Sequence, residues 1–149
     1  MKKVKIAIRN FEARDMERIL EFREETAKES FPDLKMNKEE ARKAIFRQMK
    51  RHPGTVKVAV SEGQPVGFVI FKAKNSSLGS YGRISTIFVE ASYRKHGVGA
   101  LLLKEAEKSL ASRGIKHICA DITSTNSPSL DFFREHGYRE TRTVVEKKV

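Results

Sequence analysis

The chain has 149 residues and a net charge of +11 at pH 7, and 33% of its residues are charged. This length suffices for one domain, over residues 1–149, whose buried core makes a structural metal ion or disulfide unnecessary. No stretch approaches the ~20 consecutive apolar residues of a membrane helix, and the N-terminus lacks the apolar core of a secretory signal. We therefore expect a cytoplasmic protein without a membrane partner, while the positive charge favours an anionic partner or simply solubility.

The first half of the chain predicts one strand, two helices and a β-hairpin. Asp15 is the expected N-cap of the first helix. Asn37, followed by Glu40, has the spacing of a capping box and predicts the start of the second helix. Valines that alternate with other residues predict the first strand of the hairpin. The expected elements are a strand at 5–9, helices at 16–28 and 37–50, and strands at 56–60 and 66–71.

The second half predicts strands that alternate with helices. Gly114 is the expected left-handed end of the longer helix, and Ser127, which precedes Pro128, is the expected N-cap of the shorter one. The expected elements are a polar loop at 75–80, strands at 84–89 and 115–122, helices at 99–113 and 127–136, and a strand or strand pair at 138–145. The full order, β-α-α-β-β-β-α-β-α-β, indicates an α/β (α+β) fold, with a mixed sheet and helices on its faces.

The segment from the strand at 84–89 into the next helix has the features of an anion site. Gly97 and Gly99 allow close approach of the backbone to a ligand, and the first helical turn offers unpaired N–H groups. Arg94 and Lys95 add positive charge. The spacing fits neither G-x-x-x-x-G-K-[ST] nor G-x-G-x-x-G, so it favours a pyrophosphate held in another way.

Other chemistry-bearing side chains give no pattern of a metal site. His52, His117 and His136 lie apart without ligand spacing, and His96 is explained as a loop residue whose backbone faces phosphate. The single cysteine, Cys119, excludes an internal disulfide and is expected in the core. We therefore expect no metal.

Two blocks of the sequence together resemble the GNAT superfamily of acyl-coenzyme A dependent N-acetyltransferases. Tyr93-Arg-Lys-His-Gly-Val-Gly-Ala100 resembles the pyrophosphate loop of that family, and Ile87-Phe-Val89 resembles its preceding strand, which holds the pantetheine arm. About thirty residues later, the segment from Asn126 to Tyr138 resembles the family block N-x-x-A-x-x-F-Y-x-x-x-G-F. The resemblance covers nearly the whole chain and implies a GNAT-like acyl-CoA N-acyltransferase fold with acetyl-CoA as cosubstrate.

The resemblance also assigns residues to the cofactor. It implies that acetyl-CoA lies in a cleft where the fourth and fifth strands splay, with its pyrophosphate on the opening turn of the helix that follows Arg94. Without the first block, we would interpret Asn126 as a turn residue and the two phenylalanines, Phe132 and Phe133, as core residues. The residues that the resemblance assigns to acetyl-CoA are Ile87, Phe88, Val89, Arg94, Lys95, His96, Gly97, Val98, Gly99, Ala100, Asn126, Ser129, Phe132 and Phe133.

The sequence departs from the catalytic pattern of the family at two places. The tyrosine that many members use to protonate the departing thiolate falls at Phe133, and the position that often carries a carboxylate base falls at Ser85 or Thr86. These departures favour direct attack by a neutral amine, with the backbone N–H groups of Phe88 and Val89 as oxyanion donors. Water takes the proton in this hypothesis, and the candidate relays are Glu90, Asp121, Tyr81 and Tyr138.

The function that we expect is transfer of an acetyl group from acetyl-CoA to a primary amine, with a protein or peptide α-amine among the candidates. The missing acid and base suggest a non-catalytic acyl-CoA-binding module as the alternative. A nucleic-acid-binding domain is the least favoured hypothesis, because aromatic and basic residues are not interleaved. The family architecture implies that segments 29–38 and 74–83 read the acceptor, and family members often pair as homodimers.

Overall fold

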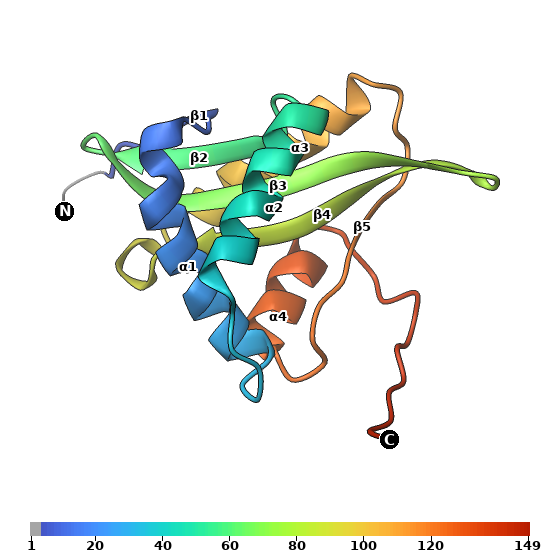
Figure 1. Cartoon of the computed structure of the whole chain (residues 1–149). Helices are drawn as coiled ribbons and strands as arrows, with labels where there is room; N and C mark the ends of the chain where they lie inside the picture. The colour runs from blue at the N-terminus through green and yellow to red at the C-terminus, as the bar shows by residue number, and fades with distance from the viewer. Residues whose placement is uncertain (1–3) are drawn as a thin grey trace.

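The computed structural model describes residues 4–149 and shows a five-stranded sheet with helices on both faces (Figure 1). The strands follow one another across the sheet in chain order, from β1 to β5. Neighbouring strands are antiparallel except β4 and β5, which are parallel. The elements are β1 (Ala7–Asn10), α1 (Met16–Ser30), α2 (Lys38–Arg51), β2 (Val56–Ser61), β3 (Gln64–Ser76), β4 (Gly79–Val89), α3 (Val98–Ala111), β5 (Ile118–Ala120) and α4 (Ser127–Glu135), with 3-10 turns at Ala13–Asp15 and Ala91–Tyr93.

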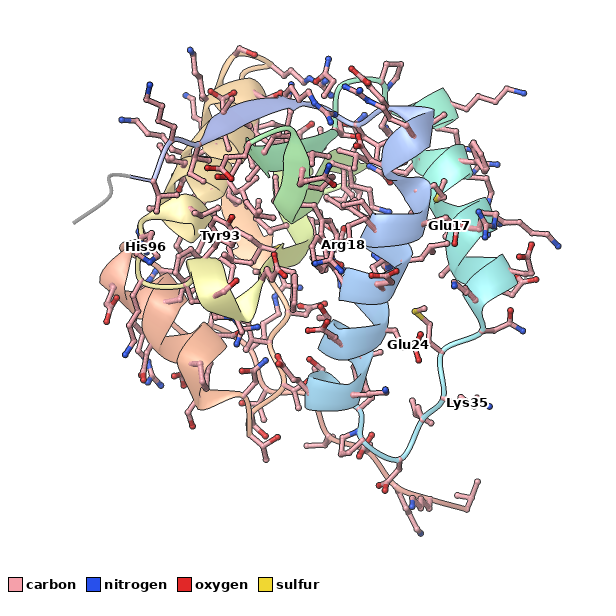
Figure 2. All side chains as sticks on the ribbon, turned by 90° about the vertical axis from the view of Figure 1, so that its left-hand side faces the viewer. Glu17, Arg18, Glu24, Lys35, Tyr93 and His96 are labelled. Atoms are coloured by element: carbon pink, nitrogen blue, oxygen red, sulfur yellow. The ribbon has the colours of Figure 1, made fainter. Side chains whose placement is uncertain are left out.

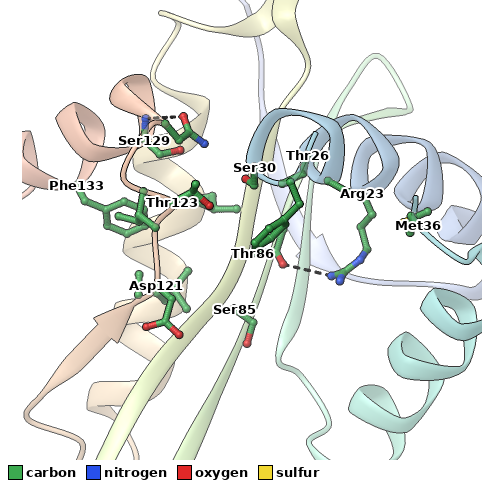
Figure 3. Close-up of a pocket in the computed structure, with 17 residues that line it drawn as sticks. Arg23, Thr26, Ser30, Met36, Ser85, Thr86, Asp121, Thr123, Ser129 and Phe133 are labelled. Carbon is green, nitrogen blue, oxygen red and sulfur yellow. Dashed lines mark hydrogen bonds between the residues drawn. The ribbon is translucent and has the colours of Figure 1, made fainter. Parts of the chain in front are cut away.

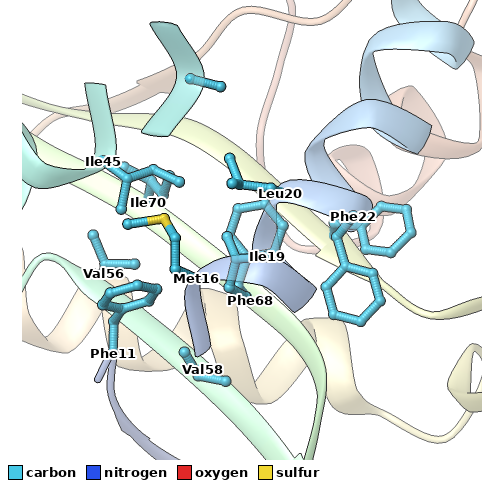
Figure 4. Packing of buried hydrophobic residues seen from close by; sticks show 12 residues of the cluster. Phe11, Met16, Ile19, Leu20, Phe22, Ile45, Val56, Val58, Phe68 and Ile70 are labelled. Carbon is cyan, nitrogen blue, oxygen red and sulfur yellow. The ribbon is translucent and has the colours of Figure 1, made fainter. Parts of the chain in front are cut away.

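Helices α1 and α2 cover one face of the sheet through an apolar cluster (Figure 4). Phe22 of α1 is fully buried, and its ring centroid lies 5.0 Å from that of Phe88 on β4 and 6.3 Å from that of Phe68 on β3. Burial of each such side chain contributes about 1.5–3 kcal/mol. The cluster therefore fixes α1 against the part of β4 that borders the site described below.

Helix α3 covers the opposite face, and α4 packs beside it. The α3 side chains at helical spacing, among them Leu102, Ala106 and Leu110, are fully buried. Gly99 permits a close approach between α3 and α4, because a Cβ built there would lie 3.1 Å from the ring of Phe132. Packing of α3 against α4 thus explains why residue 99 is a glycine. The sequence alone links this glycine to phosphate binding. Leu101, expected on the same inner side, is 42% exposed.

Asp15 occupies the N-cap position of α1, as the sequence predicts, but its side chain makes no capping hydrogen bond to α1 and stabilises the turn before it. Its side chain is 2% exposed, forms a bidentate ion pair with Arg9 at 2.7 and 2.9 Å, and accepts a hydrogen bond from the N–H of Glu12 at 2.8 Å. Burial raises the pKa of the Asp15 carboxyl, but the hydrogen bonds from Arg9 and Glu12 outweigh it and hold the pKa below its usual value.

Replacing Asp15 with alanine should therefore lower the free energy of unfolding at pH 7 by about 2–3 kcal/mol, because Arg9 loses its buried partner. The folded-state pKa lies below the unfolded value of about 3.9, so this stabilisation is present above roughly pH 4 and is lost as the pH falls through the folded pKa. Urea unfolding from pH 7 down to acid, with the exposed Asp33→Ala as control, measures both effects. Equal losses in the two variants would contradict this account.

The second half of the chain differs from its sequence-based prediction at several element boundaries. Segment 75–80 is a β-hairpin rather than a loop, since Asn75 pairs with Ser80 across β3 and β4. Strand β5 is shorter than predicted. The tail over 138–145 forms no strand with any described residue, and Val144 is 88% exposed. The half-buried Cys119 was expected in the core.

The caps of the other helices agree better with the sequence. The side chain of Asn37 accepts a hydrogen bond from the N–H of Glu40 at 3.0 Å, so this cap is confirmed. Gly114 has a φ of 81°, as expected for the left-handed residue after a helix. The cap of α4 is Asn126 rather than Ser127, and Pro128 lies within the first turn. Over residues 4–149, no helix combines the length and the apolarity that crossing a membrane requires.

Candidate active site

Strands β4 and β5 separate, so the edge of β4 that faces β5 has no paired strand beyond Ile84 among residues 4–149. The two strands pair only from Gly82 opposite Ile118 to Ile84 opposite Ala120. On the other edge of β4, Thr86 pairs with Ile70 and Ile84 with Phe71, so Ser85 is an extra residue that forms a β-bulge. Bulges bend a strand and re-aim its side chains. The bulge therefore lies at the point where the gap opens.

The strand register shows which backbone groups face this gap. The N–H of Glu90 donates to the carbonyl of Val66 on β3 at 2.8 Å, and N–H groups of an antiparallel strand alternate in direction. The polar groups of Phe88 therefore point to β3, and those of Val89 and Ile87 point to the gap. A second observation is compatible with this alternation, because the carbonyl of Val89 accepts a hydrogen bond from Arg94 Nε at 2.8 Å, a donor outside the β3–β4 ladder.

The alternation of N–H directions contradicts one of the two predicted oxyanion donors, the N–H of Phe88. The N–H of Phe88 belongs to the β3–β4 ladder and cannot face a ligand in the gap. The side chain of Phe88 is 5% exposed and packs in the α1 cluster. Val89 keeps an N–H that faces the open edge, as does Ile87, so these two residues can pair with an extended ligand as a further strand would.

The loop after β4 directs the start of α3 toward the same edge. Lys95 and Gly97 adopt left-handed backbone conformations, with φ of 66° and 78°. Gly97 is the N-cap of α3, whose first-turn N–H groups at Val98, Gly99 and Ala100 have no intrahelical partner. Such a helix start, with its partial positive charge, suits a phosphate group. The structure thus places the predicted anion-binding residues at one end of the gap.

The charged side chains around this loop form a network at the surface. Arg94 lies over the ring of Phe88 at 5.4 Å and has Glu29 within 3.7 Å. Arg18 of α1 reaches Glu90 at 2.8 Å, beside the loop that carries Tyr93 and the exposed His96 (Figure 2). The guanidinium of Arg94 is therefore engaged with β4, while the phosphate-facing role predicted for Lys95 and His96 stays a prediction.

The other end of the gap opens into a cavity of about 340 Å³ (Figure 3). Helix α1 supplies one wall, from one face of the sheet, and the segment from β5 to α4 supplies the other. Figure 3 shows Arg23 and Met36 on the α1 side, and Thr123 and Phe133 on the α4 side. The residues that line the cavity are Arg23, Thr26, Ala27, Ser30, Phe31, Met36, Ile84, Ser85, Thr86, Ile87, Ala120, Asp121, Ile122, Thr123, Asn126, Ser129 and Phe133.

Three of the predicted residues of the second block line this cavity, and the half-buried Phe132 packs outside it. Asn126, Ser129 and Phe133 line the cavity, and Asn126 Oδ1 also caps α4 by accepting from the N–H of Ser129 at 3.4 Å. The functional and the turn-forming interpretations of Asn126 are therefore compatible. Phe132 is not part of the cavity wall; it packs against Gly99 of α3 and edge-on against Phe133.

Of the four candidate proton relays, Asp121 lines the cavity. It is paired with Arg83 of β4 at the rim. Tyr138 instead donates to Glu107 Oε2 at 2.9 Å, and burial, followed by this hydrogen bond, raises the pKa of its hydroxyl. Glu90 is paired with Arg18, and Tyr81 lies outside the cavity wall. Among the lining residues, Asp121 is therefore the candidate carboxylate acceptor for a proton.

Arg23 is the functional candidate that sequence analysis missed. It lies one turn after Ile19 and Leu20, which are fully buried, and its Nη1 donates to the hydroxyl of Thr86 at 3.2 Å. The available signal was a charged residue at an inward-facing position of an amphipathic helix. Within residues 4–149, no group of three or more His, Cys, Asp or Glu side chains could hold a metal ion.

The comparisons with known proteins agree with this architecture. The family model described as "Acetyltransferase (GNAT) family" matches residues 16–138. The putative phosphinothricin acetyltransferase YwnH of Bacillus subtilis is 38% identical over 55 residues, which are 37% of this chain and 34% of that protein. The uncharacterized N-acetyltransferase YjcF of Bacillus subtilis is 31% identical over 83 residues, which are 55% of this chain and 54% of that protein. The chain thus spans about a third to a half of these curated relatives.

Solved structures share the fold over nearly the whole chain. The aminoglycoside N-acetyltransferase AAC(6')-Iy in complex with CoA superposes with a TM-score of 0.78 at 19% identity, over 99% of this chain and 97% of that chain. A putative acetyl transferase from Pyrococcus furiosus gives a TM-score of 0.78 at 23% identity, over 97% and 100%. With these likenesses, the splayed strands and the two sequence blocks, the family model match over residues 16–138 establishes that the chain belongs to the acetyltransferase (GNAT) family.

Proposed function

We propose that the protein transfers an acetyl group from acetyl-CoA to a primary amine. The observation that carries this proposal is the open edge of β4 at Ile87 and Val89, which leads from the start of α3 to the cavity. An extended ligand with a pyrophosphate at one end fits this path. Its pyrophosphate would lie on the N–H groups of the α3 turn, and its thioester end would reach the cavity wall at Phe133.

The residues around the cavity support transfer in a single step. Acetyl-CoA would supply an activated thioester, and the amine would attack it directly. Val89 would donate its N–H to the oxygen that becomes negatively charged, in a position fixed by the β3–β4 ladder. Thr86 cannot act as the base, because its hydroxyl accepts from Arg23 and has no proton-accepting strength at neutral pH. Water, or Asp121 at the rim, would take the proton released by the amine.

A thiol-release assay with acetyl-CoA and a panel of amines tests this function. The panel should contain amino acids, peptides with a free N-terminus, polyamines and aminoglycosides, and the controls omit either the amine or the protein. Calorimetry with CoA runs in parallel. We expect CoA binding together with thiol release for at least one amine class. Binding without release on the whole panel would support the non-catalytic acyl-CoA-binding module, which Phe133 favours because it offers no proton to the leaving thiolate.

Replacing Phe133 with tyrosine should raise kcat. The ring of Phe133 lines the cavity and is 5% exposed, so a hydroxyl added there reaches the cavity wall. A positioned general acid contributes about 10²–10⁴-fold, and we expect roughly a tenfold gain here because no neighbour orients the new hydroxyl. The matched control is Phe132→Tyr, whose ring packs on Gly99 outside the cavity. A gain from the control, or none from Phe133→Tyr, would argue against this placement of the leaving thiol.

The acceptor group that we propose is an α-amine. In a peptide or protein this amine has a pKa of about 7.7–8.0, so it is partly neutral at pH 7 and needs little help from a base, which fits a cavity without a strong one. We also propose that the protein forms a homodimer. The molar mass from sedimentation at several protein concentrations checks this proposal.

A further inference from the structure

The cavity contains an arginine, Arg23, that has no anionic partner among the residues that the structure describes. Arg23 is half-buried, and its Nε is buried without any hydrogen-bond partner among the described residues. Its one hydrogen bond to a side chain runs from Nη1 to the neutral hydroxyl of Thr86 (Figure 3). Other arginines of α1 and β4 form ion pairs: Arg18 pairs with Glu90, and Arg83 pairs with Asp121. None of the ion pairs in residues 4–149 includes Arg23.

A cation in this position is unfavourable unless an anion joins it. Loss of water around a guanidinium costs free energy that a neutral hydroxyl does not recover. Burial lowers the pKa of Arg23 from its usual value, yet an arginine side chain stays charged at neutral pH. Its stem and Thr86 fix its direction at the cavity wall. The site is therefore preorganised for a ligand that brings a negative charge, and a guanidinium fits a carboxylate with two parallel hydrogen bonds.

We propose that Arg23 binds the carboxylate of the acceptor, so that the substrates of this cavity are amino acids with an apolar side chain. This inference rests on the proposed function and adds the acceptor class to it. The amine would lie toward the gap beside Ile87 and Val89, where the thioester end of acetyl-CoA is proposed to lie. Phe31, Met36 and Ile122 would surround the apolar side chain.

The size and charge of the cavity agree with this substrate class. Its volume of about 340 Å³ is at the lower end of the range of about 300–1,000 Å³ typical of small-ligand sites. Asp121 is the lining carboxylate, and Arg83 neutralises it at the rim. The unpaired charge among the lining residues is thus the positive charge of Arg23. This charge attracts an anion and disfavours polycationic amines such as polyamines or aminoglycosides.

The test compares methionine with methioninamide as acceptors in the thiol-release assay. The amine pKa values of the two compounds differ, so the informative quantity is the change in their kcat/KM ratio on mutation, in which this difference cancels. Arg23→Met should lower the ratio of methionine to methioninamide about tenfold or more, because a charge-assisted hydrogen-bond pair is lost. Arg47→Met, an exposed arginine of α2, should leave the ratio unchanged. An equal effect of Arg23→Met on both acceptors would overturn the proposal.

A binding measurement separates this inference from the proposed function. Calorimetry with N-acetylmethionine and N-acetylmethioninamide, each with CoA present, requires no turnover. We expect N-acetylmethionine to bind the wild-type protein about tenfold or more tightly than the amide, and Arg23→Met to remove this preference. Arg23→Lys should keep part of it, because a lysine carries the charge but lacks the planar fork. Equal affinities for the two compounds would refute the carboxylate site even if thiol release occurs, whereas a preference without thiol release would refute the transferase function alone.

Discussion

Replacing Val89 with proline should lower kcat by about 10²–10³-fold, the loss typical of removing one oxyanion donor. The N–H of Val89 faces the gap between β4 and β5 and takes no part in the β3–β4 ladder, as the hydrogen bond from Glu90 to Val66 shows. Proline is tolerated at strand positions whose N–H points away from the ladder. The melting temperature should therefore change little, and rates from single-turnover experiments report on the oxyanion contact.

Two control variants make this prediction specific. Val89→Ala keeps the N–H and removes most of the side chain, so its kcat should stay near that of the wild type. Phe88→Pro removes an N–H that faces β3, so it should lower the free energy of unfolding by about 3 kcal/mol or more. If Val89→Ala lost as much activity as Val89→Pro, the side chain and not the N–H would be responsible. A fully active Val89→Pro would exclude this oxyanion donor altogether.

A peptide with a free α-amine should be acetylated at pH 7 with a kcat/KM about 10² times that of a peptide whose single free amine is a lysine side chain. An α-amine has a pKa of about 7.7–8.0 and is neutral at roughly the ten-per-cent level, whereas a lysine amine near 10.4 is neutral in under about one part in a thousand. The cavity offers no strong base to close this difference, since Ser85 and Thr86 are hydroxyls and Asp121 is paired with Arg83.

The pH profile gives a second measurement of the same hypothesis. For the α-amine peptide, kcat/KM should rise with pH and level off above about pH 9, where more than about 90% of the amine is deprotonated. For the lysine peptide the rise should continue about tenfold for each pH unit toward pH 10. Equal rates at pH 7 would mean that the protein itself removes the proton, and the Asp121→Asn variant would then show whether that carboxylate is responsible.

Features that depend on neighbours along the chain are predictable from the residues alone. The cap at Asn37, the left-handed Gly114 and the start of α3 each follow from local backbone chemistry, and the structure contains them. Hydrophobic periodicity predicted the helices and most strands for the same reason. The two sequence blocks together identified the GNAT family, which the family model confirms.

The predictions that were wrong concern local signals that tertiary contacts override. Asp15 lies at the predicted N-cap position, but Arg9 of β1 lies within 2.7 Å and binds its carboxylate, which makes no capping hydrogen bond to α1. The polar segment 75–80 looks like a loop, but pairing of β3 with β4 extends through it. The tail over 138–145 is predicted as a strand or strand pair, but none of the described strands pairs with it. A strand needs a partner, and the local sequence does not show whether one is present.

The site depends on relations between residues far apart in the chain, and these arise from packing across the sheet. The register of β3 against β4 turns the N–H of Val89 into the gap and that of Phe88 away from it, a difference that reverses with a shift of one residue. Arg23 and Thr86 are 63 positions apart, so no local pattern places that arginine at a cavity wall without an anion. Local interactions specify helices, turns and the phosphate-binding loop, whereas packing across the sheet determines which polar groups remain for a substrate.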